Sequence, residues 1–351
     1  MNTEFRLLTA LGVLALAQGA DAAPTLVVKR PPAGMTAAQF QQKLTPILEA
    51  RKLQQATLDQ QTSTKVQSAL ASVEPERKLL SAALARDPRY QSLLDQARAI
   101  STSKADAATR AAQMQALLGA NRVVFNDALR SSGVDPAAFQ SKLQLKLAPV
   151  RKSSPLSTAA TPATIPDLKL SPPLDFESTE TNNGGLAYSA AVADADVDAG
   201  TAKMHATVIG VAGSAKGDSI VGQSIDVPAG VSRIEVTVTA SISYNGAAFS
   251  ALLASTACAN VSIELWTADL SDRLDADAIG DCVMAPIGWY EEMSGDETRD
   301  YVYSTSVTGG TRHFVLFGDA HSFTIGGGIP GYGEAKTRAE IKKIKVHFVQ
   351  N

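Results

Sequence analysis

The sequence is poor in the residues that build metal and redox centres, with two cysteines and four histidines in 351 residues. No His-Glu-x-x-His or comparable metal spacing occurs, which excludes the common zinc-hydrolase motifs. The glycine-rich stretch at residues 210–217 lacks the Gly-Lys-Ser/Thr order of a phosphate loop, and no Gly-x-Ser-x-Gly elbow is present. No catalytic motif stands out, and a non-enzymatic role is the favoured interpretation.

Long apolar runs are also missing, apart from one at residues 7–17. That run is shorter than the roughly 20 apolar residues that a membrane-spanning helix needs. Small residues at Ala20 and Ala22 follow it, which completes the layout of a secretory signal peptide. We therefore predict a signal peptide over residues 1–22 and a flexible segment over 23–35. The mature chain is expected to be secreted or periplasmic, with no transmembrane segment.

The two cysteines are Cys258 and Cys282. In an oxidising compartment they can form one disulfide, which stabilises by roughly 3–4 kcal/mol in the chain-entropy description. Two buried free thiols are the alternative. Export favours the disulfide.

Charge divides the chain into two parts. Residues 36–152 carry 17 Lys and Arg against 9 Asp and Glu, a net charge of +8, and residues 153–351 carry 12 against 24, a net charge of −12. The basic residues are spread out, whereas nucleic-acid binding requires a tighter cluster with aromatics. No nucleic-acid partner is expected, and the favoured interpretation of the basic residues is solvated helix faces.

The first part has the pattern of helices. Thr36 and Gln39 fit a capping box, and apolar residues then recur every three or four positions. Proline stands just inside four expected helix starts, at Pro46, Pro75, Pro88 and Pro136. We predict a small helical domain over residues 36–151, as a bundle or a homo-oligomer formed through its helices. A Pro/Ser/Thr-rich linker is expected over 152–173.

After the linker the apolar period changes to two. Residues 233–244 alternate cleanly, and similar segments occur at 202–211 and 219–227 and recur as far as 341–349, with Gly-, Pro- and Asn-containing turns between them. Seven to nine strands with one polar face each predict an antiparallel β-sandwich over residues 174–351, with a jelly roll as one arrangement. The fold class is therefore an α plus all-β multidomain protein.

An acidic stretch from residue 269 to 300 is expected to form a long loop. Asp272, Asp275, Asp277 and Asp281 crowd together within it. Carboxylate oxygens on a loop of an exported protein favour Ca²⁺ over transition metals, so these four residues are the candidate calcium ligands. A solvated acidic loop without an ion is the alternative, and no other cofactor is indicated.

Aromatic residues accompany the acids in the same expected loop. Trp289 and Tyr290 lie there, beside Tyr301 and Tyr303. Exposed rings next to carboxylates are typical of sugar-binding surfaces, where the ring stacks on the sugar. The alternative is that the tryptophans belong to the core.

Together these features favour an exported, non-enzymatic binding or interaction protein. Its β-sandwich is expected to present the acidic, aromatic loop to a glycan or protein partner at the cell surface or envelope. One alternative is a structural envelope or surface component assembled through its helices. Another is a carboxylate-dependent hydrolase.

Overall fold

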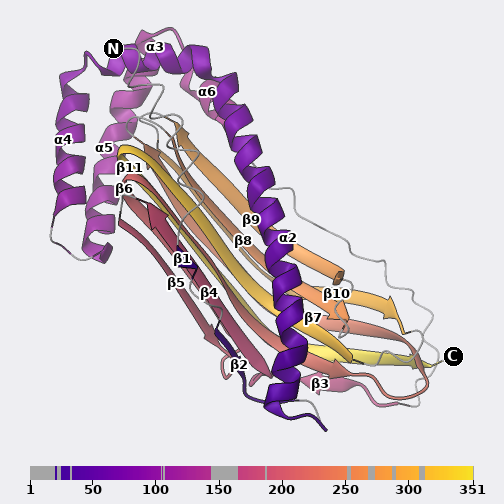
Figure 1. The fold of residues 1–351 in the computed structure, drawn as a ribbon. Helices are drawn as coiled ribbons and strands as arrows, with labels where there is room; N and C mark the ends of the chain where they lie inside the picture. The colour runs from indigo at the N-terminus through magenta and orange to yellow at the C-terminus, as the bar shows by residue number, and fades with distance from the viewer. Residues whose placement is uncertain are drawn as a thin grey trace.

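The computed structural model describes residues 20–21, 25–31, 34–103, 105, 107–143, 165–185, 188–250, 254–267, 273–286, 290–307 and 313–350. Residues 1–19 of the predicted signal peptide and 152–164 of the predicted linker lie outside these ranges. The described residues form a mainly antiparallel β structure with a few helices (Figure 1).

The helices are α2 (Ala37–Ser72), α3 (Glu74–Leu84), α4 (Pro88–Thr102), α5 (Ala107–Ser131) and α6 (Pro136–Leu143). The strands are β1 (Ala20–Asp21), β2 (Thr25–Val28), β3 (Leu168–Leu170), β4 (Phe176–Gly185), β5 (Tyr188–Asp196), β6 (Thr201–Asp226), β7 (Val231–Ser250), β8 (Ala254–Thr267), β9 (Arg273–Pro286), β10 (Tyr290–Ser306) and β11 (His313–Gln350). Among the described helices, none is long and apolar enough to cross a membrane.

Two very long strands, β6 and β11, build both layers of the sandwich. They pair with each other along almost their whole length, with a shift in register between Gly327 and Gly331. The hydroxyls of Ser322 and Thr337 lie 15 residues apart on β11 but only 3.1 Å from each other. Each strand therefore folds back at its glycine-rich middle, and its two halves lie in opposite layers. Glycine permits such a bend because it carries no side chain.

The two layers are antiparallel sheets. The first sheet contains β5, residues 201–210 of β6, residues 331–350 of β11, β7 and β10. The second sheet contains β4, residues 213–226 of β6, residues 313–327 of β11, β8 and β9, with β1 and β2 on the outer edge of β4. The prediction of antiparallel sheets in two layers is confirmed; the jelly roll and a separate helical domain stay predictions.

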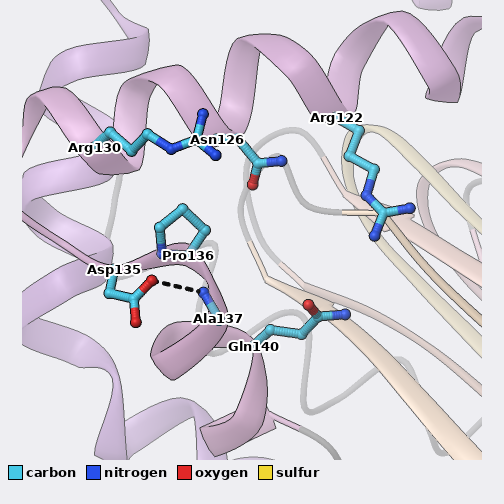
Figure 2. Close-up of a pocket in the computed structure, with 7 residues that line it drawn as sticks. All are labelled: Arg122, Asn126, Arg130, Asp135, Pro136, Ala137 and Gln140. Carbon is cyan, nitrogen blue, oxygen red and sulfur yellow. Dashed lines mark hydrogen bonds between the residues drawn. The ribbon is translucent and has the colours of Figure 1, made fainter.

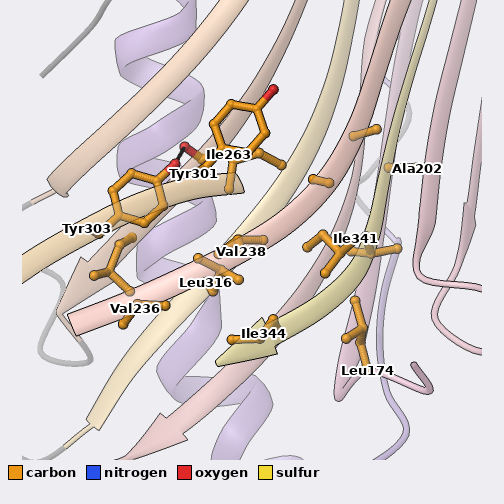
Figure 3. Packing of buried hydrophobic residues seen from close by; sticks show 14 of the residues in the cluster. Leu174, Ala202, Val236, Val238, Ile263, Tyr301, Tyr303, Leu316, Ile341 and Ile344 are labelled. Atoms are coloured by element: carbon orange, nitrogen blue, oxygen red, sulfur yellow. Dashed lines mark hydrogen bonds between the residues drawn. The ribbon is translucent and has the colours of Figure 1, made fainter. Parts of the chain in front are cut away.

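The main core fills the space between the sheets (Figure 3). Val236 and Val238 on β7 are fully buried against Ile263 on β8 and Leu316 on β11. The alternation along each strand sends every second side chain into this layer. Full burial of such a side chain stabilises the fold by about 1.5–3 kcal/mol. The period of two in the sequence is thus the direct cause of the sandwich.

Helix α2 packs on the outer face of the second sheet (Figure 1). Its capping box is confirmed, because the Thr36 N–H donates to the Gln39 side chain and the Gln39 N–H donates to the Thr36 hydroxyl. Phe40 lies edge-on to Phe176 of β4, with ring centres 6.0 Å apart. Pro46 lies inside α2 and does not start a helix, so that expected helix start is wrong.

Helices α3 to α6 pack together at one end of the sandwich (Figure 1). Pro75, Pro88 and Pro136 lie at or next to the first residue of α3, α4 and α6, where a missing N–H costs little. Tyr90 of α4 and Phe125 of α5 form an edge-on pair, 5.8 Å between ring centres. The same buried cluster includes Tyr332 of β11, so these helices share a core with the sheets.

Candidate functional site

The predicted disulfide is present. Cys258 on β8 and Cys282 on β9 are directly opposite each other, with Cα atoms 4.1 Å apart and the sulfur atoms bonded. Both side chains are buried. The bond ties the outermost strand of the second sheet to its neighbour.

The expected acidic loop is not a loop over most of its length. Residues 273–286 form β9 and residues 290–306 form β10, so this expectation is corrected. Charged residues at alternate positions are compatible with edge strands, which natural sheets protect with charge. The pattern of acidic residues in the sequence does not by itself distinguish an edge strand from a loop.

The four candidate calcium ligands are placed only in part. Asp272 lies outside the described residues. Asp275 and Asp277 lie on β9 opposite Leu265 and Ile263, and the structure describes their backbone but not their side chains. Asp281 is half-buried and its carboxylate accepts the N–H of Cys282 at 2.9 Å. Among the described residues, no group of three or more His, Cys, Asp and Glu side chains could hold a metal ion. The calcium site stays a prediction.

The aromatic residues of the predicted sugar-binding surface are described only in part. Trp289 lies outside the described residues, and Tyr290 opens β10 with its side chain outside the description. Tyr301 and Tyr303 are about 99 % buried in the core, so they do not contribute to an exposed aromatic surface.

A buried network of charges lies between α2 and the second sheet. Arg51 of α2 contacts Asp319 on β11, Asp218 on β6 at 3.3 Å and Glu264 on β8 at 3.7 Å. His321 Nδ1 lies 3.0 Å from the same Asp218 oxygen. Since these side chains are closed off by the helix, their arrangement fits the docking of α2 better than contact with a substrate.

The carboxyl groups of this network ionise differently. Burial above all raises the pKa of Asp319 to about 8, and the neighbouring Asp218 and Glu264 add to the effect against the opposing charge of Arg51. Burial also opposes ionisation of Asp218, but His321 and Arg51 outweigh it and hold the pKa of Asp218 well below its usual range. Burial therefore disfavours the ionised form of Asp319, whereas the neighbouring cations favour the carboxylate form of Asp218.

The outer face of the first sheet is polar and open to solvent, and we call it the polar face. Its side chains are exposed or half-buried, and they alternate with the buried residues of the same strands. It consists of Lys203 on β6, Thr239, Ser241 and Ser243 on β7, Asp296, Thr298 and Asp300 on β10, and Lys336, Arg338 and Glu340 on β11.

Cross-strand contacts hold the polar face in order. The Thr239 hydroxyl donates to Asp300 at 2.6 Å, and the hydroxyls of Ser241 and Thr298 are 2.6 Å apart. Within β11 itself, Arg338 pairs with Glu340 at 2.9 Å. Such contacts restrict side-chain rotation before any ligand binds, which lowers the entropy cost of binding.

A buried carboxylate, Glu334 of β11, lies at one end of the polar face. It accepts the Tyr332 hydroxyl at 2.7 Å and lies 2.8 Å from His205 Nε2 and 2.7 Å from Lys336 Nζ. Burial opposes its ionisation, but the hydrogen bonds from His205, Lys336 and Tyr332 lower the pKa of Glu334 to about 2. Each of its oxygens already has a partner, so Glu334 anchors Lys336 and His205 and is poorly placed to act as a general base.

The arrangement suits binding more than chemistry. Hydroxyls, carboxylates and cations lie side by side on the outer face of the sheet, and they can donate to and accept from a ligand that is rich in hydroxyl groups. Sequence reasoning missed the polar face because its residues come from four strands, none of which carries a motif. The signal that could have located it is the polar half of the alternation in residues 235–243 and 294–304.

Comparison with known proteins adds little. No family model and no curated protein matches the chain. Similar solved structures include TmCBM61 in complex with β-1,4-galactotriose, with 9% identity and a TM-score of 0.16 over 46% of this chain and 88% of that chain. A family 11 carbohydrate-binding module from Clostridium thermocellum in complex with a β-1,3-1,4-mixed-linked tetrasaccharide has 9% identity and a TM-score of 0.14, over 47% and 87% of the two chains. The tailspike protein 4 of Bacteriophage CBA120 has 13% identity and a TM-score of 0.16, over 46% and 19%. At these TM-scores the likeness carries no argument about this chain.

Proposed function

We propose that this chain is an exported, non-enzymatic protein that binds a glycan on the polar face. The observation that carries the proposal is the ordered set of hydroxyl, carboxylate and cationic side chains on an open sheet. The predicted signal peptide supports a cell-surface or envelope setting, where glycans are abundant.

The chemistry of the polar face favours a glycan over a protein partner. Its side chains are almost all polar, whereas the centre of a stable protein interface is enriched in apolar and aromatic residues. Its cations are paired with acids, as in Lys203 with Asp194 at 3.1 Å and Lys336 with Glu334, so the local charge is largely balanced. A sugar chain offers hydroxyl groups that match such a surface. Trp289 and Tyr290, which precede and open β10, remain the proposed stacking residues for the same ligand.

Affinity electrophoresis of the purified chain tests this proposal. Gels that contain a β-glucan, a galactan or a polygalacturonate should retard the wild-type protein with at least one of these polymers. The variant with Thr239→Val and Asp300→Asn should lose at least tenfold in affinity, equal to about 1.4 kcal/mol. Glu76→Gln on α3 is the matched control, because this acid also has one hydrogen-bonded partner, Lys142, but lies far from β7 and β10 in the fold.

Two results would contradict the proposal. One is that no polymer of the panel, extended to envelope polysaccharides, retards the protein. The other is equal retardation of the wild type and the double variant. Shortening of the polymer during incubation would favour the hydrolase alternative.

A further inference from the structure

A pocket of about 240 Å³ lies between α5 and the start of α6, away from the polar face (Figure 2). Its walls combine polar and charged side chains with the apolar surface of Pro136 and Ala137, all from the two helices and the turn between them. The lining residues are Arg122, Asn126, Arg130, Asp135, Pro136, Ala137 and Gln140.

Helix geometry explains why two arginines share this pocket. Arg122, Asn126 and Arg130 are spaced by four residues on α5 and so form one row along the helix. At 1.5 Å per residue, the backbones of the two arginines are about 12 Å apart along the axis. The carboxamide of Asn126 lies between them, and Gln140 of α6 stands opposite (Figure 2).

The lining of the pocket carries a net charge of +1, from two arginines and one aspartate. Asp135 caps α6, because its carboxylate accepts the N–H of Ala137 at 3.2 Å. The guanidinium of Arg130 lies 3.8 Å from the carboxylate of Asp127, which is a long distance for an ion pair. Arg122 is exposed, and no acidic side chain among the described residues forms an ion pair with it. A guanidinium in this state can form two parallel hydrogen bonds with a carboxylate.

We propose that this pocket binds a hydroxylated monocarboxylate of the size of one acidic sugar residue. A single negative charge on the ligand would balance the net charge of the lining. The carboxylate of Asp135 would repel the second charge of a dianion. The amides of Asn126 and Gln140 both donate and accept hydrogen bonds, which suits hydroxyl groups. The volume equals that of about eight liquid waters at roughly 30 Å³ each, enough for one substituted six-membered ring. The proposal does not rest on glycan binding by the polar face.

Isothermal titration of the full chain with sodium glucuronate tests the proposal. Saturable binding in the millimolar range is expected, with glucose failing to bind at the same concentrations because it lacks the carboxylate. Arg122→Gln should weaken binding at least tenfold, and Arg130→Gln should weaken it too. Lys78→Gln is the matched control: it removes one positive charge from an exposed position on α3 and should leave binding unchanged.

Inorganic phosphate at matched ionic strength distinguishes an organic carboxylate from any small anion. If phosphate displaces glucuronate with similar affinity, or if Arg122→Gln binds glucuronate as the wild type does, the proposal is wrong. Both arginine variants are exposed substitutions, and their melting temperatures report whether the helices remain folded.

The two proposed sites are separable. The double variant Thr239→Val and Asp300→Asn should bind glucuronate normally, and Arg122→Gln should be retarded by the polysaccharide as the wild type is. Glucuronate binding that disappears with the polar-face variant, but persists in Arg122→Gln, would assign it to the polar face instead.

Discussion

At the scale of single residues, Asp319 shows most clearly how burial and charge compete. Its carboxyl group is fully buried beside Arg51, with Asp218 and Glu264 nearby. Its pKa is about 8 in the folded protein, against 3.8 for the unperturbed group. Between these values the folded state holds a proton that the unfolded state has released. The contribution of Asp319 to stability is therefore complete below about pH 4 and is lost as the pH rises towards 8.

Asp319→Asn tests this assignment, because the amide resembles the protonated acid and cannot ionise. In the wild type, the free energy of unfolding should fall between pH 5 and pH 8 as Asp319 becomes harder to keep protonated. The variant should lack this part of the fall, which amounts to at least about 1 kcal/mol. Guanidinium unfolding at the two pH values measures it. Asp198→Asn, at an exposed carboxylate, should keep the pH dependence of the wild type. Identical pH dependence in wild type and Asp319→Asn would contradict the assignment.

At the level of single residues, the sequence predicted contacts correctly where few pairings were possible. Cys258 and Cys282 were the only available pair, and the disulfide is confirmed. The network of Arg51 could not be foreseen in the same way, because its partners lie on β6, β8 and β11, more than 160 residues further along the chain. Only the fold brings them together.

At the scale of elements, α2 depends on a single buried cation. Phe40, Leu44 and Ile47 supply its apolar contacts with the second sheet, and Arg51 supplies the charged one. Without the guanidinium, the carboxylates of Asp218 and Glu264 stay buried with less compensation, and such a loss typically costs several kcal/mol.

Arg51→Met should therefore lower the free energy of unfolding by about 3–5 kcal/mol. Lys52→Met is the matched control on the next residue: Lys52 pairs with Glu180 at 2.6 Å, but its side chain is 42% exposed. Pairs at the surface contribute at most about 1 kcal/mol. Chemical unfolding of both variants checks the contrast, and equal losses in the two would show that the buried network does not hold the helix.

The sequence predicted strand segments well and their connections poorly. Alternation marked residues 202–211 and 219–227 as separate strands, but the structure joins them into β6. The glycines between them act as a bend at which hydrogen bonding to β11 continues, so they do not end the strand. In the same way, the acids of residues 273–300 were expected in a loop and lie mostly on β9 and β10. Composition indicates exposure, but exposed residues occur on edge strands as well as on loops.

At the scale of the whole molecule, the opposite charges of the two parts have a structural use. The positive part was expected to be a set of solvated helix faces, and many of its cations are exposed. Arg51 and Lys52, however, meet Asp218 and Glu180 of the negative part across the interface of α2 with the second sheet. Because the helices also share apolar cores with both sheets, the described helices and sheets support one another.

At the scale of the whole molecule, we propose that the ligand binds across the polar face of the first sheet. Hydrogen–deuterium exchange with and without a polysaccharide that retards the protein tests it most directly. We expect slower exchange in peptides that cover residues 237–245 of β7 and 294–302 of β10, and unchanged exchange in α3. Protection confined to the helices, or to the second sheet, would contradict it.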